Sequence, residues 1–102
     1  LAGPIPPELG QLQALKTLSL SSNQLSGSIP KELGDLSELK GLSLSFNQLT
    51  GVRETRLVPK ELGALSKLKT LSLGENRLTG SIPPELGKLA ALEFLRLSNN
   101  QL

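Results

Sequence analysis

The sequence predicts an α/β solenoid, in which short strands and short helical turns alternate and successive repeats stack on one another. Three observations predict it: a phrase of about 24 residues recurs four times, each copy holds a Leu-x-Leu pattern, and each copy holds a Pro-x-Glu-Leu-Gly turn. One such unit cannot bury its leucines alone, whereas stacked units share a continuous core. We therefore expect a single domain over residues 1–102.

The repeat boundaries follow from aligning the phrase with itself. The four units span residues 1–24, 25–48, 49–77 and 78–101, with lengths of 24, 24, 29 and 24 residues. The first and second units are identical at 16 of 24 positions, and the second and fourth at 15 of 24. Such identity indicates duplication of one unit or an engineered origin. The five extra residues of the third unit fit an engineered origin poorly, because a designer would regularise them.

Each unit contains one predicted strand. Leu18 and Leu20 alternate with Ser19, so we expect the leucines to face the core and the serine to face solvent. The corresponding segments of the four units are residues 15–23, 39–47, 68–76 and 92–100.

Two turn elements complete each unit. A Leu-[Ala/Ser/Thr]-Gly step follows the strand, and its glycine permits a positive φ. The PPELGQL run at Pro6–Leu12 holds its proline and glycine too close together for a long helix. We therefore expect a 3₁₀ helix or a single helical turn in each unit, with its leucines facing the core.

The combined phrase LxxLxLxxNxLxGxIPxELGxL resembles the leucine-rich repeat (LRR), in its plant-type class of 24 residues, and the resemblance covers the whole chain. It implies a right-handed curved solenoid with a parallel β-sheet on the concave side. It also implies a short second strand on the flank, from the LxGxIP segment, and 3₁₀ or short-helix turns on the convex side.

One asparagine per unit is predicted to be structural. A buried amide needs hydrogen-bond partners, so we expect these side chains to bond backbone groups of neighbouring turns. The expected internal ladder consists of Asn23, Asn47, Asn76 and Asn100.

The composition excludes several kinds of chemistry. The chain has no Cys, His, Met, Trp or Tyr, and so has no thiol or imidazole for catalysis or for a soft metal. Its net charge of +2 comes from interspersed charges, whereas nucleic-acid-binding proteins usually carry a clustered basic face. No apolar run is long enough to span a bilayer. We expect no catalysis, cofactor or metal, and no nucleic-acid or membrane contact by this segment.

Two further motifs have structural explanations. A glutamate recurs at one position of each unit, at Glu8, Glu32, Glu61 and Glu85. Equivalent, solvated carboxylates do not form an acid/base pair, and we expect them in the first turn of each short helix. The GSIPPELGKL segment departs from a P-loop, because six residues separate its glycines and a leucine follows its lysine.

The candidate binding face consists of the variable positions between the fixed leucines, which the resemblance places on the concave surface. In columns across the repeats they are Lys16, Lys40, Lys69 and Glu93; Thr17, Gly41, Thr70 and Phe94; Ser19, Ser43, Ser72 and Arg96; Ser21, Ser45, Gly74 and Ser98; and Ser22, Phe46, Glu75 and Asn99.

Within that face we predict a small set of partner contacts. Three lysines in register favour an acidic partner, although lysines at a sheet margin are also common as a soluble edge. Large exposed apolar side chains are enriched at binding hot spots, although scattered ones are normal on any surface. The remaining Ser, Thr and Gly positions make the face shallow, without a small-molecule pocket. The predicted contacts are Lys16, Lys40, Lys69, Phe46, Phe94, Arg96 and Glu75.

The extra residues of the third unit are Val52–Arg56 or Arg53–Leu57, and the alignment leaves both open. They follow the strand, so we expect a charged tip on the flank carrying Arg53, Glu54 and Arg56 as secondary contacts. Loops tolerate insertions and also carry function. A tolerated bulge and a contact loop therefore both remain open.

The favoured function is a non-catalytic recognition module that presents its concave face to a protein or peptide. Two alternatives stay open: a structural spacer, or the sensing part of a larger signalling protein. Plant-type repeats are similar to those of receptor-like kinases outside the cell and of ROCO-type GTPases, including algal ones, inside it. The compartment, extracellular or cytoplasmic, stays open for the same reason.

The chain begins at Leu1 in the middle of the repeated phrase, without an initiator Met or a signal peptide. Caps of secreted plant-type relatives usually carry paired cysteines, and this chain has no cysteine. We therefore expect an uncapped piece of a longer array. Its end repeats are expected to expose core leucines and strand edges, and so to favour end-to-end self-association.

Overall fold

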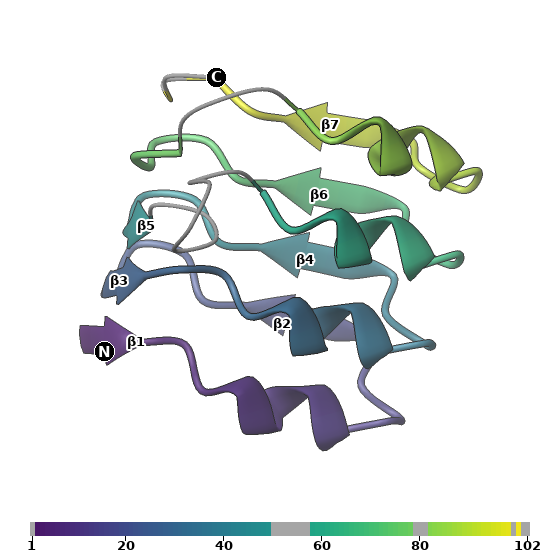
Figure 1. The fold of residues 1–102 in the computed structure, drawn as a ribbon, viewed down its shortest axis with the longest axis horizontal. Helices are drawn as coiled ribbons and strands as arrows, with labels where there is room; N and C mark the ends of the chain where they lie inside the picture. Colours follow the sequence, from purple (N-terminus) through teal and green to yellow (C-terminus); the bar gives the residue numbers. More distant parts are fainter. Residues whose placement is uncertain (1, 50–57, 79–81, 99, 101–102) are drawn as a thin grey trace.

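The computed structural model describes residues 2–49, 58–78, 82–98 and 100, which form a solenoid of stacked repeats (Figure 1). Short strands and 3₁₀ helices (η) alternate along it. In chain order they are β1 (Ala2–Pro4), η1 (Pro7–Gln11), β2 (Thr17–Ser19), β3 (Gln24–Gly27), η2 (Lys31–Asp35), β4 (Gly41–Ser43), β5 (Gln48–Leu49), η3 (Lys60–Ala64), β6 (Thr70–Ser72), η4 (Pro84–Lys88) and β7 (Phe94–Arg96).

Two parallel sheets run along the solenoid. The main sheet, here called the concave sheet, has the order β2-β4-β6-β7, and the flank sheet has the order β1-β3-β5. Equivalent positions of successive repeats face one another, so Leu18 pairs with Leu42, Leu42 with Leu71, and Leu71 with Leu95. Both the parallel main sheet and the flank strands predicted from the sequence are confirmed.

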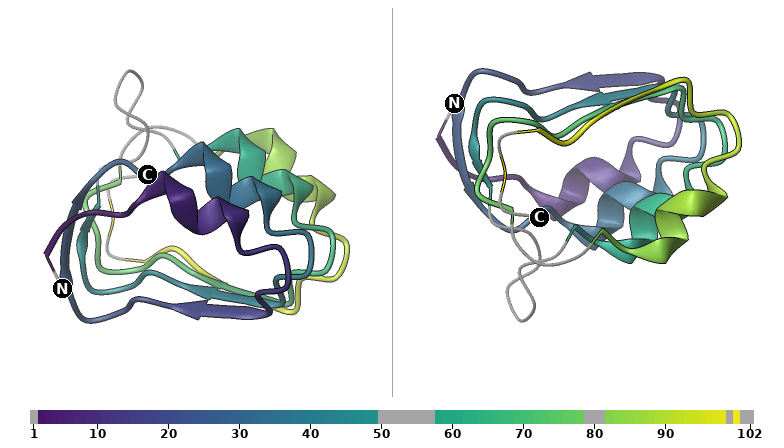
Figure 2. Two further views of the ribbon diagram at one scale, coloured as in Figure 1. Left: turned by 90° about the horizontal axis from the view of Figure 1, so that it is seen from below. Right: turned by 90° about the horizontal axis from the view of Figure 1, so that it is seen from above.

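The four 3₁₀ helices form the side of the solenoid opposite the concave sheet (Figure 2). Each follows an extended proline and has one glutamate in its first turn. A following leucine ends each helix by donating its backbone N–H to the carbonyl of the residue three positions earlier. The predicted short helical turns are confirmed, and the recurring glutamates take the positions expected of structural residues.

A glycine in each helical turn lets successive repeats approach closely. A Cβ atom added at Gly10, Gly34 or Gly63 would overlap the backbone carbonyl of the glutamate in the following repeat. Any other residue at these positions would push the repeats apart. A Cβ atom at Gly87 would meet no described atom within 4 Å, because Gly87 lies in the last repeat.

The core is a column of leucines that runs through all four repeats. Leu42 and Leu71, in the inner strands, are 1% and 0% exposed, whereas Leu95 of the last strand is 46% exposed. Leu12 in the first repeat and Ile82 in the fourth are 49% and 46% exposed. Burial therefore depends on having a repeat on each side, as expected for a solenoid.

The asparagines of the repeats link successive turns. Asn47 donates its Nδ2 protons towards the carbonyls of Leu20 and Leu44, each at 3.0 Å, and its Oδ1 accepts the N–H of Leu25 at 3.1 Å. Asn76 repeats the arrangement one turn further on, accepting the N–H of Leu49 at 3.1 Å. Each of these buried amides satisfies backbone groups that would otherwise lie unpaired in the core.

Candidate functional site

The three lysines predicted as contacts lie side by side at one margin of the concave sheet. The backbone N–H of Lys40 donates to the carbonyl of Lys16 at 2.7 Å, and that of Lys69 donates to the carbonyl of Lys40 at 2.8 Å. Glu93 continues the column by donating to the carbonyl of Lys69 at 2.8 Å. All three lysine side chains are exposed, which makes this margin a row of cations that ends in a carboxylate.

A carboxylate beside this row was missed by the sequence reasoning. Glu38 forms an ion pair with Lys67, with the Lys67 Nζ atom 2.8 Å from Oε2 and 3.1 Å from Oε1. The hydrogen bond from Lys67 and its charge lower the pKa of Glu38, with smaller contributions from the charges of Lys16 and Lys40. The two residues occupy equivalent positions of consecutive repeats, and this was the sequence signal that could have revealed the pair.

Serine side chains bond one another across the first three strands of the concave sheet. Ser21 bonds Ser43 through their hydroxyl groups, and Ser45 bonds Ser72 at 2.5 Å. Ser45 is only 3% exposed, and Gly74 is buried as well. These two positions of the predicted binding face are therefore buried and not exposed, Ser45 beside the Ser72 hydroxyl and Gly74 beside the Arg96 side chain.

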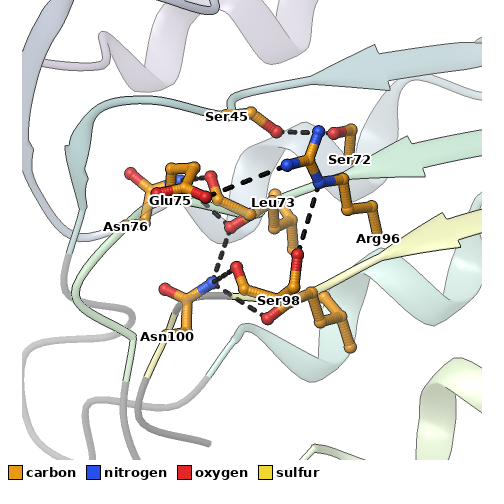
Figure 3. Close-up of polar contacts among 10 residues, drawn as sticks. Ser45, Ser72, Leu73, Glu75, Asn76, Arg96, Ser98 and Asn100 are labelled. Carbon is orange, nitrogen blue, oxygen red and sulfur yellow. Dashed lines mark hydrogen bonds and ion pairs between the residues drawn. The ribbon is translucent and has the colours of Figure 1, made fainter.

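Each serine pair joins one repeat to the next. At the equivalent positions between the third and fourth repeats, Gly74 and Arg96 replace the two serines. A Cβ atom at Gly74 would stand 3.2 Å from Nε and 3.4 Å from Cγ of Arg96. The glycine therefore leaves the space across which the arginine side chain extends. Figure 3 shows that side chain reaching from β7 back towards the third repeat.

The guanidinium group of Arg96 meets three side chains there. Its Nε donates to the Ser98 hydroxyl at 3.3 Å, and an Nη atom lies 3.8 Å from a carboxylate oxygen of Glu75. Its central carbon lies 5.7 Å from the ring centroid of Phe46, a cation–π distance. Three of the predicted contact residues, Phe46, Glu75 and Arg96, thus form one cluster, which we call the arginine cluster.

Phe46 has an uncommon backbone conformation as well as an exposed ring. Its φ is +59°, a value shared by the equivalent Ser22 at +59° and Glu75 at +57°. Non-glycine residues rarely adopt this left-handed region, and bulky ones least of all. The ring is 50% exposed and lies outside the buried core. The turn of the repeat imposes this conformation. A phenylalanine is energetically unfavourable in it, and its ring adds nothing to the packing of the core.

Phe94 adds a second exposed ring to the same surface. It lies on β7, two residues before Arg96, and so on the same face of the sheet. The ring is 53% exposed. The loop residues predicted as secondary contacts, Arg53, Glu54 and Arg56, lie outside the described part of the chain.

The described residues contain neither a metal site nor a membrane-spanning helix. No group of three or more Asp or Glu side chains there is arranged to hold a metal ion. Within those same residues, no helix has the length and apolarity needed to cross a bilayer. Hollows between successive 3₁₀ helices, such as the one lined by Glu8, Glu32 and Asp35, are open grooves on the convex side.

Comparison with known proteins assigns the chain to a family. The family model described as leucine rich repeat matches residues 5–49 and 55–102. No curated protein matches the sequence in a direct comparison.

Solved structures match over almost the whole chain. The LRR ectodomain of the plant membrane receptor kinase GASSHO1/SCHENGEN3 from Arabidopsis thaliana, in complex with CASPARIAN STRIP INTEGRITY FACTOR 2, is 48% identical over 100% of this chain, with a TM-score of 0.93. PEPR1, in a structure with AtPEP1, is 48% identical over 98%, with a TM-score of 0.91. A plant ice-binding protein is 40% identical over 98%, with a TM-score of 0.88.

The chain spans only 12%, 13% and 31% of these three proteins. The repeat phrase, the two parallel sheets, the 3₁₀ turns and these matches agree with one another. The chain belongs to the leucine-rich repeat family, in its plant-type class.

Proposed function

We propose that this chain recognises a protein or peptide ligand on its concave face and catalyses no reaction. The observation that carries the proposal is the arginine cluster with its neighbour Phe94. Two exposed aromatic rings and an arginine occupy one face of a sheet whose core is already complete without them. Aromatic side chains, phenylalanine included, and arginine are enriched at protein–protein interfaces.

The strain at Phe46 supports recognition over a purely structural role. A spacer segment would gain stability from glycine or asparagine at a φ of +59°, because these residues tolerate the left-handed region. The conformation itself belongs to the repeat, because Ser22 and Glu75 share it, and only the bulky side chain of Phe46 is unusual there. An exposed aromatic ring in such a conformation is therefore more consistent with a contact residue than with a spacer.

Similarity to a receptor ectodomain supports a protein or peptide ligand. GASSHO1/SCHENGEN3 and PEPR1 are each 48% identical to this chain, and the first is named as a membrane receptor kinase crystallised with a partner. We infer that this chain is part of the sensing surface of a larger signalling protein. Its shallow, open face suits an extended segment, which makes contacts along several repeats at once.

A selection experiment tests the proposal directly. A random peptide library displayed on phage is selected against the immobilised chain, and the affinity of each recovered peptide is measured by fluorescence anisotropy. Phe46→Ser, Arg96→Ser and Lys40→Ser are each expected to weaken binding about tenfold, which corresponds to about 1.4 kcal/mol.

The matched control is Lys60→Ser, an exposed lysine on the convex side in η3. It removes the same charge as Lys40→Ser and is expected to leave the affinity unchanged. Recovery of no binding peptide, or equal weakening by the convex and concave variants, would overturn the proposal.

A further inference from the structure

Charges that are interspersed along the sequence are separated by the fold. The convex 3₁₀ helices carry five carboxylates against three lysines, namely Glu8, Glu32, Asp35, Glu61 and Glu85 against Lys31, Lys60 and Lys88. The segments that lead from these helices into the concave sheet carry four lysines against two glutamates, namely Lys16, Lys40, Lys67 and Lys69 against Glu38 and Glu93. An acidic ligand is therefore attracted to this margin of the concave sheet and repelled from the convex side.

The centre of this margin lies in the second and third repeats, which have a neighbouring repeat on each side. Leu39 and Leu68 are fully buried there, and the residues on either side of each leucine remain on the surface. These surface residues are Glu38, Lys40, Lys67 and Lys69. Their exposure is therefore a property of the position within the repeat.

Only one of the three lysines at this centre has a carboxylate partner. Lys67 Nζ lies 2.8 Å from Oε2 and 3.1 Å from Oε1 of Glu38, so this pair bridges the two repeats. Within the described part of the chain, neither Lys40 nor Lys69 forms an ion pair. These two lysines follow one another in register, and like charges on neighbouring strands are unfavourable. A carboxylate from a ligand would relieve that repulsion.

The four lysines act on the same place. The hydrogen bond and the charge of Lys67 lower the pKa of Glu38, and the charges of Lys16 and Lys40 lower it further. The margin thus favours an ionised carboxylate beside Lys67, and Glu38 is the carboxylate of the chain itself that occupies this place.

We propose that the lysine margin, consisting of Lys16, Lys40, Lys67 and Lys69, binds an acidic segment of the ligand, and that Glu38 limits the affinity by competing for Lys67. This proposal rests on the proposed function, because it names the chemistry of the ligand that the concave face recognises. The ligand's carboxylates contact Lys40 and Lys69 directly, whereas a carboxylate that contacts Lys67 displaces that of Glu38.

An extended peptide with acidic residues at alternate positions fits the spacing of the lysines. Neighbouring strands lie about 4.8 Å apart, and alternate side chains of an extended chain lie about 6.6 Å apart. The flexible four-carbon stem of lysine is able to span this difference. Nucleic-acid-binding proteins neutralise more phosphates over a longer basic surface, so a short acidic segment suits these few lysines better.

Fluorescence anisotropy with designed peptides tests the chemistry of the ligand. The probe is a labelled peptide in which glutamate alternates with threonine, and its control has glutamine in place of each glutamate. The acidic probe is expected to bind at least about tenfold more tightly at low salt, and added salt is expected to reduce the difference. Equal affinity for the two peptides would overturn the proposal. Tighter binding of a single-stranded oligonucleotide or of phosphatidylserine vesicles would overturn it as well.

The peptides recovered by phage selection distinguish this proposal from the proposed function. They are expected to be acidic, and Lys69→Gln is expected to weaken their binding about fivefold, whereas Lys60→Gln on the convex side leaves it unchanged. Neutral peptides that depend on Phe46 but not on Lys69 would leave recognition by the concave face standing and overturn the acidic ligand. Recovery of no peptide would overturn the proposed function itself.

Glu38→Gln tests the competition for Lys67. It is expected to tighten binding of the acidic probe about threefold at low salt, although it removes an ion pair from the fold. The matched control is Glu61→Gln in η3, which makes the same charge change on the convex side and is expected to leave the affinity unchanged. A residue that only supports the fold would not tighten binding when replaced, so unchanged or weaker binding by Glu38→Gln overturns its assigned role.

A double-variant cycle separates competition from simple repulsion of the ligand. In a Lys67→Gln background Glu38 has no lysine to withhold, so the gain from Glu38→Gln is expected to be smaller than in the original chain. Circular dichroism verifies that each variant is folded. A gain of the same size in both backgrounds would show that Glu38 acts through its charge alone and would overturn the competition for Lys67.

Discussion

The third and fourth repeats use the same phrase, yet they differ in how fully their residues are enclosed. Leu71 in the third repeat is fully buried, whereas Leu95 at the same position of the fourth is 46% exposed. Gly63 touches the next repeat, whereas Gly87 faces open space. The repeated sequence therefore determines the backbone of a repeat, and the neighbouring repeats supply most of its burial.

The two repeats also differ from the earlier ones on the concave face. Ser45 and Ser72 bond each other where the second repeat meets the third, and Gly74 and Arg96 take the equivalent places at the next junction. This exchange removes a polar link and leaves room for a long cationic side chain. Local variation of small residues within a fixed backbone is thus sufficient to create the arginine cluster.

The largest difference between the third and fourth repeats is expected when the equivalent leucines, Leu71 and Leu95, are each truncated to alanine. Leu71→Ala is expected to lower the free energy of unfolding by about 4 kcal/mol, since it removes a fully buried side chain and leaves a cavity. Leu95→Ala is expected to cost about 1 kcal/mol, because water already reaches that side chain. Urea unfolding followed by circular dichroism measures both, under conditions in which the chain is monomeric. Equal losses would contradict the role assigned to neighbouring repeats.

A smaller difference is expected between inner and outer asparagines. Asn47→Ala should cost about 2 kcal/mol, because it leaves the buried N–H of Leu25 without an acceptor, whereas the carbonyls of Leu20 and Leu44 keep hydrogen bonds from other asparagines. Asn23→Ala should cost about 1 kcal/mol, because Asn23 is only half-buried and water is able to replace its side chain. The same unfolding experiment separates the two variants, and a larger loss at Asn23 would contradict the expected order.

Most of the fold could be predicted from the sequence, because the repeat period fixes which positions are equivalent. The strands, the flank sheet and the 3₁₀ turns all follow from spacing that occurs four times. The arginine cluster could not be predicted, although its members were named, because Arg96 reaches Phe46 only where Gly74 leaves space between them. That contact depends on three single-residue departures from the repeat, and a repeat pattern carries no information about such departures.

Two further details, one backbone conformation and one ion pair, were not predicted from the repeat pattern. The left-handed conformation of Phe46 is a property of the turn, and the phenylalanine itself gives no indication of it. The pair between Glu38 and Lys67 was overlooked because both lie outside the five columns taken as the binding face. The conformation became visible only in the three-dimensional structure, whereas the pair was already indicated by the equivalent positions of Glu38 and Lys67 in consecutive repeats.

The two exposed phenylalanines should respond in opposite directions to the same substitution. Phe46→Asn is expected to raise the free energy of unfolding by about 0.5 kcal/mol, since the gain from an asparagine at a positive φ exceeds the loss of the exposed cation–π contact with Arg96. Phe94→Asn is expected to lower it by about 0.5 kcal/mol, because asparagine is unfavourable in a strand. Thermal unfolding measures both, and destabilisation by Phe46→Asn would contradict the strain assigned to that position.

The smallest effect concerns the ion pair that joins the second and third repeats, at positions held by alanine in the first and fourth. The folded-state pKa of Glu38 lies below the ordinary value of 4.5, so the ionised carboxylate favours folding. This contribution is fully present above pH 4.5 and is lost as the pH falls through the folded-state pKa. Glu38→Gln should therefore lower the unfolding midpoint slightly at neutral pH and have no effect in strong acid.

Salt and a double-variant cycle show whether that difference comes from the pair itself. Both groups are exposed, so added salt should reduce the effect of Glu38→Gln at neutral pH. The same substitution made in a Lys67→Gln background should have almost no effect, because its hydrogen-bond donor is already absent. An undiminished pH-dependent difference in that background would contradict the assignment to Lys67 and would mean that Lys16 and Lys40, which also lower the pKa of Glu38, stabilise its carboxylate instead.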